Sequence, residues 1–93
     1  MILTEMKSIV DALQMRLGEK FNTITIGERM CFILPDGRII AVGYMTPYGA
    51  VVVEYADNAD EAKLNRFEDG DLFYVEEMTI DEVFSAMLQE MEL

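Results

Sequence analysis

Between residues 21 and 55, four strand-like runs follow one another with short turn or loop sequences between them. The runs cover residues 21–26, 29–34, 38–43 and 50–55. Gly27-Glu28 suits a two-residue hairpin turn, and Pro35-Asp36-Gly37 suits a three-residue loop with its glycine in a left-handed conformation. Because tight hairpins join antiparallel neighbours, this part of the chain predicts a four-stranded antiparallel β-meander.

Helical patterns flank the predicted sheet. Residues 4–17 place apolar side chains at helical spacing, with Thr4 as the N-cap and Gly18 as the stop. Residues 58–61 (Asn-Ala-Asp-Glu) and 79–82 (Thr-Ile-Asp-Glu) both match the capping box that opens a helix. We expect the first of these helices to run to about Asp69 and to stop at Gly70.

The last helix is predicted to run from residue 79 toward the C-terminus. Its apolar stripe consists of Ile80, Val83, Phe84, Met87, Leu88 and Met91, with Phe84 near the middle. Residues 72–75 are short and apolar, which suits a fifth strand or a packed extended segment. The sequence therefore predicts an α+β fold with an N-terminal helix, a four-stranded antiparallel meander, and two acidic helices separated by a short extended segment.

Length and composition predict one domain. The chain has 93 residues, of which 52% are apolar, so the acidic half is expected to fold rather than to form a solvated tail. Three strand runs are apolar on both alternating faces, at residues 30–34, 39–42 and 51–53. Both faces of the sheet must then be covered, either by helices divided between its two sides or by a second copy of the chain.

The net charge of −11 lies entirely in the last forty residues. Residues 1–53 carry five acids and five bases, whereas residues 54–93 carry thirteen acids and two bases. Such a field repels nucleic acid and anionic lipid and attracts basic protein surfaces. We therefore expect no direct binding of nucleic acid and no membrane association. The absence of a secretory pattern and of a long apolar run predicts a cytoplasmic protein.

The sequence offers little for catalysis or for a cofactor. It contains no histidine and no glycine-rich phosphate loop, and Cys31 lies in an apolar run where a small core side chain is expected. The best alignment to a calcium-binding loop starts at Asp57 but places alanine where a ligand and a glycine are required. The cluster Glu68-Asp69-Gly70-Asp71 could hold a divalent ion weakly or could be a solvated helix end. We predict no enzyme activity, no cofactor and no resident metal.

Carboxylates are the remaining candidates for a binding site. Asp60, Glu61, Asp81 and Glu82 lie in first helical turns, where negative charge also complements the helix dipole. Glu68 and Asp69 are expected at a helix C-terminus, where negative charge is unfavourable, which suggests selection for binding or for solubility. The predicted partner-binding residues are Asp60, Glu61, Glu68, Asp69, Asp71, Glu76, Glu77, Asp81 and Glu82.

The chain is small, and it carries an acidic block at residues 57–92 and the run D-E-A-K-L-N-R-F-E-D-G-D at residues 60–71. In these features it resembles the small acidic inhibitors of phages and mobile elements. These are the anti-CRISPR and anti-restriction proteins that imitate nucleic acid. The resemblance implies a non-enzymatic protein whose carboxylates occupy a basic nucleic-acid-binding surface, with a basic nucleic-acid-binding protein as the partner. The alternative is a structural or adaptor module that forms a homodimer and is acidic only for solubility. A small carboxylate enzyme or a cation-binding protein is a third reading.

Overall fold

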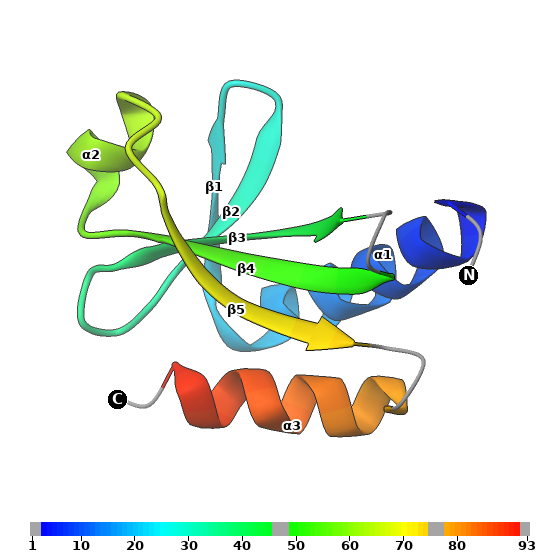
Figure 1. The fold of residues 1–93 in the computed structure, drawn as a ribbon. Coiled ribbons are helices and arrows are strands. Elements are labelled where there is room, and N and C mark those ends of the chain that lie inside the picture. Colours follow the sequence, from blue (N-terminus) through cyan, green and yellow to red (C-terminus); the bar gives the residue numbers. More distant parts are fainter. Residues whose placement is uncertain (1–2, 46–48, 75–77, 92–93) are drawn as a thin grey trace.

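The computed structural model describes residues 3–45, 49–74 and 78–91 (Figure 1). Its elements are α1 (Leu3–Lys20), β1 (Asn22–Ile26), β2 (Arg29–Ile33), β3 (Ile39–Met45), β4 (Ala50–Ala56), α2 (Ala59–Lys63), β5 (Glu68–Tyr74) and α3 (Ile80–Glu90). The protein thus has the predicted α+β organisation of an N-terminal helix, an antiparallel sheet and helices in the C-terminal half. It differs from the prediction in three respects: α1 continues past Gly18 to Lys20, the second helix is shorter, and the segment expected at residues 72–75 belongs to a fifth strand that starts at Glu68.

The sheet follows the order of the chain. Its strand order is β1-β2-β3-β4-β5, and every neighbouring pair is antiparallel. The expected turn residues join the first three strands. Gly27 and Gly37 have left-handed φ angles of 63° and 93°. Glycine adopts such angles without the strain that a Cβ would add. The four-stranded meander is confirmed. β5 extends it, so that β1 and β5 form the two edges of the sheet.

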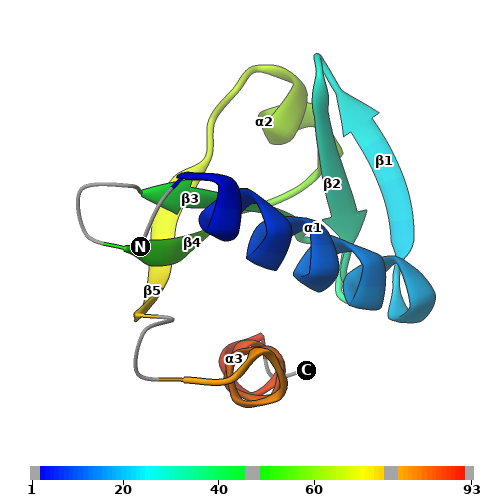
Figure 2. The same ribbon diagram turned by 90° about the vertical axis from the view of Figure 1, so that its right-hand side faces the viewer.

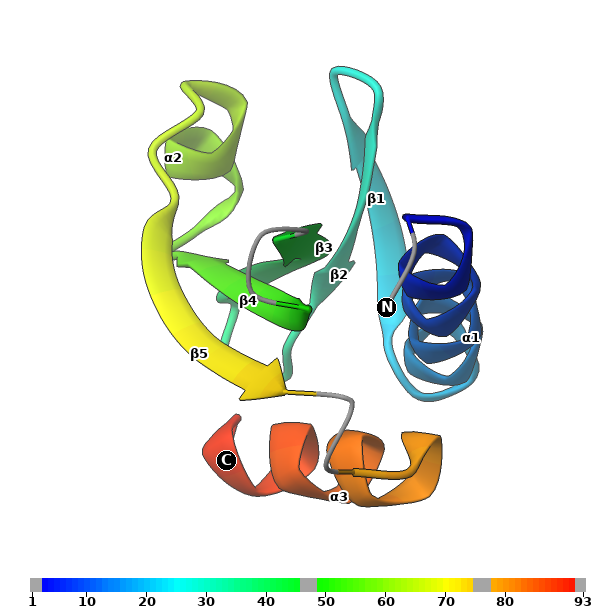
Figure 3. The same ribbon diagram turned by 45° about the vertical axis from the view of Figure 1, so that its right-hand side comes forward.

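The helices are divided between the two faces of the sheet, which explains the strands that are apolar on both sides. α1 and α3 pack on one face (Figures 2 and 3), where Leu13, Leu17 and Met87 meet Phe32 and Val53. The short α2 packs on the opposite face, where Ala62 joins a smaller cluster that includes Cys31. The prediction that Cys31 is a core side chain is confirmed, since the thiol is buried and its burial raises its pKa.

The apolar stripe of α3 is rotated relative to the expected one. Val83, Met87 and Met91 are buried, whereas Phe84 is only half-buried and lies under the guanidinium of Arg16, whose Cζ is 5.7 Å from the ring centroid. All of the expected positions are apolar, so the sequence alone does not rank them by depth. Contact with the sheet selects the Val83–Met91 line as the deepest part.

The prediction of a helix from residue 58 to about Asp69 is wrong, because α2 ends at Lys63. The chain reverses after Leu64: Asn65 has a left-handed φ of 58°, and the Arg66 amide donates a hydrogen bond of 2.9 Å to the Glu61 carbonyl. Residues 68–74 then form β5 along the edge of β4. Pairing with β4 therefore determines the conformation of this acidic segment.

A close approach of backbone and side chain fixes the start of β5. The ladder between β4 and β5 changes register between Val52 and Glu54. A Cβ at Gly70 would collide there with the Tyr55 ring and with the carbonyl oxygen of Val53. The glycine that sequence analysis places at a helix stop is needed in the structure for strand packing.

We predict that Gly70→Ala lowers the free energy of unfolding by about 1 to 3 kcal/mol, because a backbone oxygen cannot move aside as a flexible side chain can. Urea melts measure the loss. Gly43→Ala is the matched control, since a Cβ at that strand position would meet Val52 Cγ1 at an ordinary 3.6 Å. Equal stability of the Gly70→Ala and Gly43→Ala proteins would show that the two strands do not approach as described.

Candidate acidic binding surface

The turn into α2 and the start of β5 bring several carboxylates to one edge of the sheet. We call this region the α2–β5 acidic surface, and it comprises Asp57, Asp60, Glu61 and Glu68. Asn58 positions the first part of it, because its side-chain oxygen accepts a 2.9 Å hydrogen bond from the Glu61 amide and so begins α2. The reversal at residues 64–66 then returns the chain, and Glu68 comes back beside Glu61.

A shallow hollow of about 270 Å³ lies between α2 and β5. It is lined by Asp57, Glu61, Arg66, Phe67 and Glu68. The hollow therefore combines three carboxylates with one aromatic ring, which are groups that a lysine or arginine side chain can bind through charge and through contact with the ring. An acidic hollow with an aromatic wall is suited to a cationic group.

The Phe67 ring is held in place from the sheet side. The Arg29 guanidinium lies over the ring, with its Cζ 5.0 Å from the centroid, and donates a 2.8 Å hydrogen bond to Glu54. Phe67 also packs against the α2 face of the sheet. The hollow is thus anchored to β2 and β4, and its position does not depend on α2 alone.

Most of the charge on this surface is not neutralised within the protein. Residues 57–68 contain four acids and two bases, a net charge of −2. Glu61 pairs with Arg66 at 3.3 Å, whereas the exposed side chains of Asp57, Asp60 and Glu68 have no ion pair within the described ranges. The Arg66 side chain is itself 67% exposed, so this pair adds little stability, and a cation from a partner could replace Arg66.

Asp71 is half-buried and lies apart from this surface, because its partner Tyr55 packs on the α1–α3 face of the sheet. Its carboxylate accepts a 3.1 Å hydrogen bond from the Tyr55 hydroxyl. Burial of the phenol, reinforced by the charge of Asp71 and by this hydrogen bond, raises the pKa of Tyr55 to about 12 from its usual 10.0. Asp71 therefore has a structural role in joining β5 to β4.

We predict that one tyrosine of the folded protein ionises near pH 12 and that this step disappears in Tyr55→Phe, as ultraviolet absorbance of the phenolate would show. The unfolded chain releases the Tyr55 proton near pH 10 and the folded chain only near pH 12, so this residue's contribution to stability is lost as the pH rises through that window. Asp71→Asn should lower the pKa of Tyr55 while burial keeps it above 10. An unchanged titration in Tyr55→Phe would contradict the assignment.

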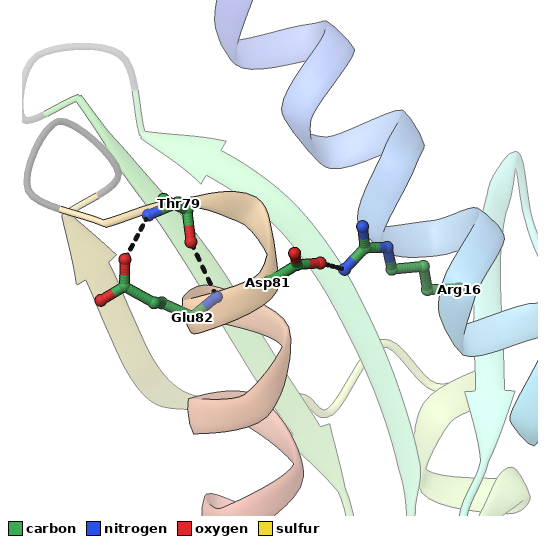
Figure 4. A network of polar contacts seen from close by, with 4 residues as sticks. All are labelled: Arg16, Thr79, Asp81 and Glu82. Carbon is green, nitrogen blue, oxygen red and sulfur yellow. Dashed lines mark hydrogen bonds and ion pairs between the residues drawn. The ribbon is translucent and has the colours of Figure 1, made fainter.

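The predicted site residues at the start of α3 already have partners within the protein (Figure 4). Asp81 forms an ion pair with Arg16 of α1. The Glu82 carboxylate accepts a 3.1 Å hydrogen bond from the Thr79 amide, and the Thr79 hydroxyl accepts one from the Glu82 amide, which confirms the capping box. Asp81 and Glu82 therefore stabilise the position of α3, and we do not assign them to the α2–β5 acidic surface.

The nine predicted site residues do not form one continuous group. Asp60, Glu61 and Glu68 come together around α2 and the start of β5, whereas Asp71 contacts Tyr55 on the α1–α3 face of the sheet. Asp81 and Glu82 lie beyond the other end of β5 (Figure 1). Asp69 pairs with Glu54 on the β5 backbone, and its side chain lies outside the described part. Glu76 and Glu77 also lie outside the described residues.

The predicted site residues did not include Asp57, Arg66 and Phe67, which line the hollow. The prediction of a continuous helix across residues 58–69 concealed their proximity, because it would have pointed them in different directions. A phenylalanine surrounded by Arg66, Glu68 and Asp69 was the available signal, since an isolated aromatic residue in a charged segment suggests a packed turn.

A search of protein-family models, curated proteins and solved structures found no match to this chain. Within the described ranges, no three metal-ligating side chains converge on a common point. No helix in the same ranges is both long enough and apolar enough to span a membrane.

Proposed function

We propose that the protein is a non-enzymatic binding protein that docks its α2–β5 acidic surface onto a basic nucleic-acid-binding surface of another protein and blocks it. One observation carries the proposal: Asp57, Asp60 and Glu68 are exposed on neighbouring segments, and no ion pair within the described residues neutralises them. This function is the one expected of an acidic, anti-CRISPR-like mimic of nucleic acid.

Electrostatics supports a basic protein as the partner. A groove that binds nucleic acid presents lysine and arginine side chains to a lattice of phosphates, and carboxylates at similar density compete for the same cations. Asp57, Asp60, Glu61 and Glu68 supply four carboxylates within twelve residues. Nucleic acid itself is repelled by the same charge.

The shape of the surface supports the same class of partner. The hollow between α2 and β5 accepts one cationic side chain, with Glu61 and Glu68 for the charge and Phe67 for its apolar stem. β5 is an edge strand, so the surface projects from one end of the sheet rather than from the middle of a face. A protruding acidic edge can enter a groove that a flat surface could not.

The proposal is tested with the triple variant Asp57→Asn, Asp60→Asn, Glu68→Gln. The control variant Asp11→Asn, Glu19→Gln, Glu90→Gln removes the same three charges from exposed positions elsewhere. Each protein is immobilised and challenged with nuclease-treated bacterial lysate, and every retained protein is purified and assayed for competition with labelled DNA and RNA. We expect the parent and the control to retain nucleic-acid-binding proteins that DNA or RNA displaces, and the α2–β5 variant to lose them.

Two results would count against this function. One is retention of the same proteins by the α2–β5 variant and by the parent. The other is retained proteins that bind nucleic acid and this chain at the same time. Unchanged thermal melts of both variants provide the check on folding, because the substituted side chains are exposed and surface substitutions typically change stability by no more than about 0.5 kcal/mol.

The alternative of a dimerising structural module has one specific observation in its favour, which is the open edge of β1. That edge belongs to the neutral half of the chain and is separate from the α2–β5 acidic surface. Association through that edge is compatible with the proposed function.

A further inference from the structure

We propose that the protein forms a symmetric homodimer in which β1 pairs antiparallel with β1 of a second copy. The inference does not rest on the proposed function, because β1 and the acidic strand β5 are opposite edges of the sheet. Pairing at β1 would join two five-stranded sheets into one and leave both acidic edges on the outside.

β1 has the features of a strand with an unfilled edge. Its sequence is Asn-Thr-Ile-Thr-Ile, and its pairing with β2 is regular over all five residues. The strand contains no charged residue, no proline and no bulge, which are the devices that usually prevent pairing at an edge. Within the described residues its outer side has no partner strand (Figure 2).

The hairpin geometry identifies the backbone groups that face outward. Ile26 and Arg29 flank the two-residue turn and therefore form a hydrogen-bonded pair, and such pairs alternate along an antiparallel ladder. By this alternation, the N–H and C=O groups of Thr23 and Thr25 point away from β2. These two residues supply the donors and acceptors for a further strand.

The sequence of β1 is suited to pairing with itself. With Ile24 on the two-fold axis, Thr23 of one copy lies opposite Thr25 of the other, so the outward groups meet in two symmetric pairs. Isoleucine then faces isoleucine on one side of the joined sheet, and threonine faces threonine on the other. Both kinds of cross-strand pair favour antiparallel association.

Charge complementarity favours the same register. Lys20 is two residues before β1 and Glu28 is two residues after it. In this antiparallel arrangement, Lys20 of one copy therefore lies near Glu28 of the other copy. Both side chains are exposed, and the two-fold axis produces this juxtaposition twice. Two copies can approach here without strong repulsion, since residues 1–53 carry no net charge.

An apolar groove near β1 adds surface that a second copy would cover. It has a volume of about 490 Å³ and is lined by residues that include Met15 of α1 and Met30 of β2, which are 72% and 49% exposed. Met30 lies opposite Thr25 near the tip of the hairpin. In the proposed register the last turn of the second copy's α1 reaches this tip, because α1 ends two residues before β1 begins.

Sedimentation equilibrium over a concentration series measures the dissociation constant of the dimer. The proteins compared are the parent chain and two variants, each with one charge reversed. Lys20→Glu and Glu28→Lys should each raise the dimer dissociation constant by roughly 2- to 30-fold, because each substitution removes two exposed ion pairs and places like charges together. The double reversal should restore the parent value to within about twofold. Lys63→Glu makes the same charge change on α2 and should leave the constant unchanged.

Thr25→Pro provides an independent test, since it removes an outward N–H without removing a hydrogen bond to β2. We expect this variant to be a monomer. Its circular dichroism spectrum should match that of the parent protein. A parent protein that stays monomeric up to millimolar concentration would overturn the proposal, and so would a dimer that none of the β1 variants weakens. The Asp57→Asn, Asp60→Asn, Glu68→Gln variant should dimerise like the parent, so dimerisation and the proposed function can fail separately.

Discussion

Phe32→Ala is expected to lower the free energy of unfolding by about 3 to 5 kcal/mol. Phe32 lies in the middle of β2, is fully buried, and is among the largest side chains in the core between the sheet and the helices α1 and α3. Its removal leaves a cavity that neighbours on a paired strand cannot fill. A small domain has about 5 to 15 kcal/mol of stability in total, so the variant should be close to unfolding at room temperature.

Met30→Ala is the matched control for Phe32→Ala. Met30 points to the same face from the same strand but is 49% exposed. Its loss should cost less than about 1 kcal/mol, since little apolar surface leaves the core. Denaturant melts with an unchanged slope would show that both differences arise from stability alone. Similar midpoints for the two variants would contradict the position assigned to α1 and α3.

Met87→Ala has the second-largest expected effect, a loss of about 2 to 5 kcal/mol. Met87 is fully buried on the face of α3 that meets the sheet, between Val83 and Met91. Phe84→Ala should cost less despite the larger side chain, because Phe84 is half-buried at the margin of that face. Gln89→Ala, at an exposed position of the same helix, should be nearly neutral.

The order of these losses distinguishes two orientations of α3. If Phe84→Ala destabilised the protein more than Met87→Ala, the helix would have to be rotated so that the Ile80–Phe84–Leu88 line faced the sheet. Urea melts of the three variants, compared at a common temperature, are sufficient to decide between these orientations.

The sequence was informative where short-range chemistry determines the structure. Gly27 and Gly37 mark the two turns of the meander, and the cap residues Asn58 and Thr79 mark the starts of α2 and α3. Each of these features depends on the conformation or hydrogen bonding of a few adjacent residues. A single sequence contains all that is needed to predict them.

The sequence was misleading where a distant strand determines the structure. The capping box at residues 58–61 predicts the start of a helix but not its end, and nothing nearby shows that β4 has a free edge to be filled. In the sequence, Gly70 is equally consistent with the end of a helix and with a close approach of the backbone to Tyr55 and Val53. Misplacing β5 also misplaced Glu68 and obscured its proximity to Asp57 and Phe67.

For the candidate site, the sequence predicted the charge but not its distribution. Asp81 and Glu82 follow the same pattern as Asp60 and Glu61, yet Asp81 joins α3 to α1 and Glu82 caps α3. That distinction requires Arg16, which is 65 residues away from Asp81 in the chain. A tertiary contact between such distant positions cannot be predicted from local spacing.

Docking onto a nucleic-acid-binding surface is tested by competition between this chain and labelled DNA or RNA for a purified nucleic-acid-binding partner, repeated between about 50 and 300 mM salt. We expect mutually exclusive binding, because this chain and the nucleic acid require the same lysines and arginines. We also expect the affinity of the protein complex to fall by at least about tenfold over that range, as the Debye length decreases below about 10 Å. A ternary complex with nucleic acid, or an affinity that does not change with salt, would contradict docking onto that surface.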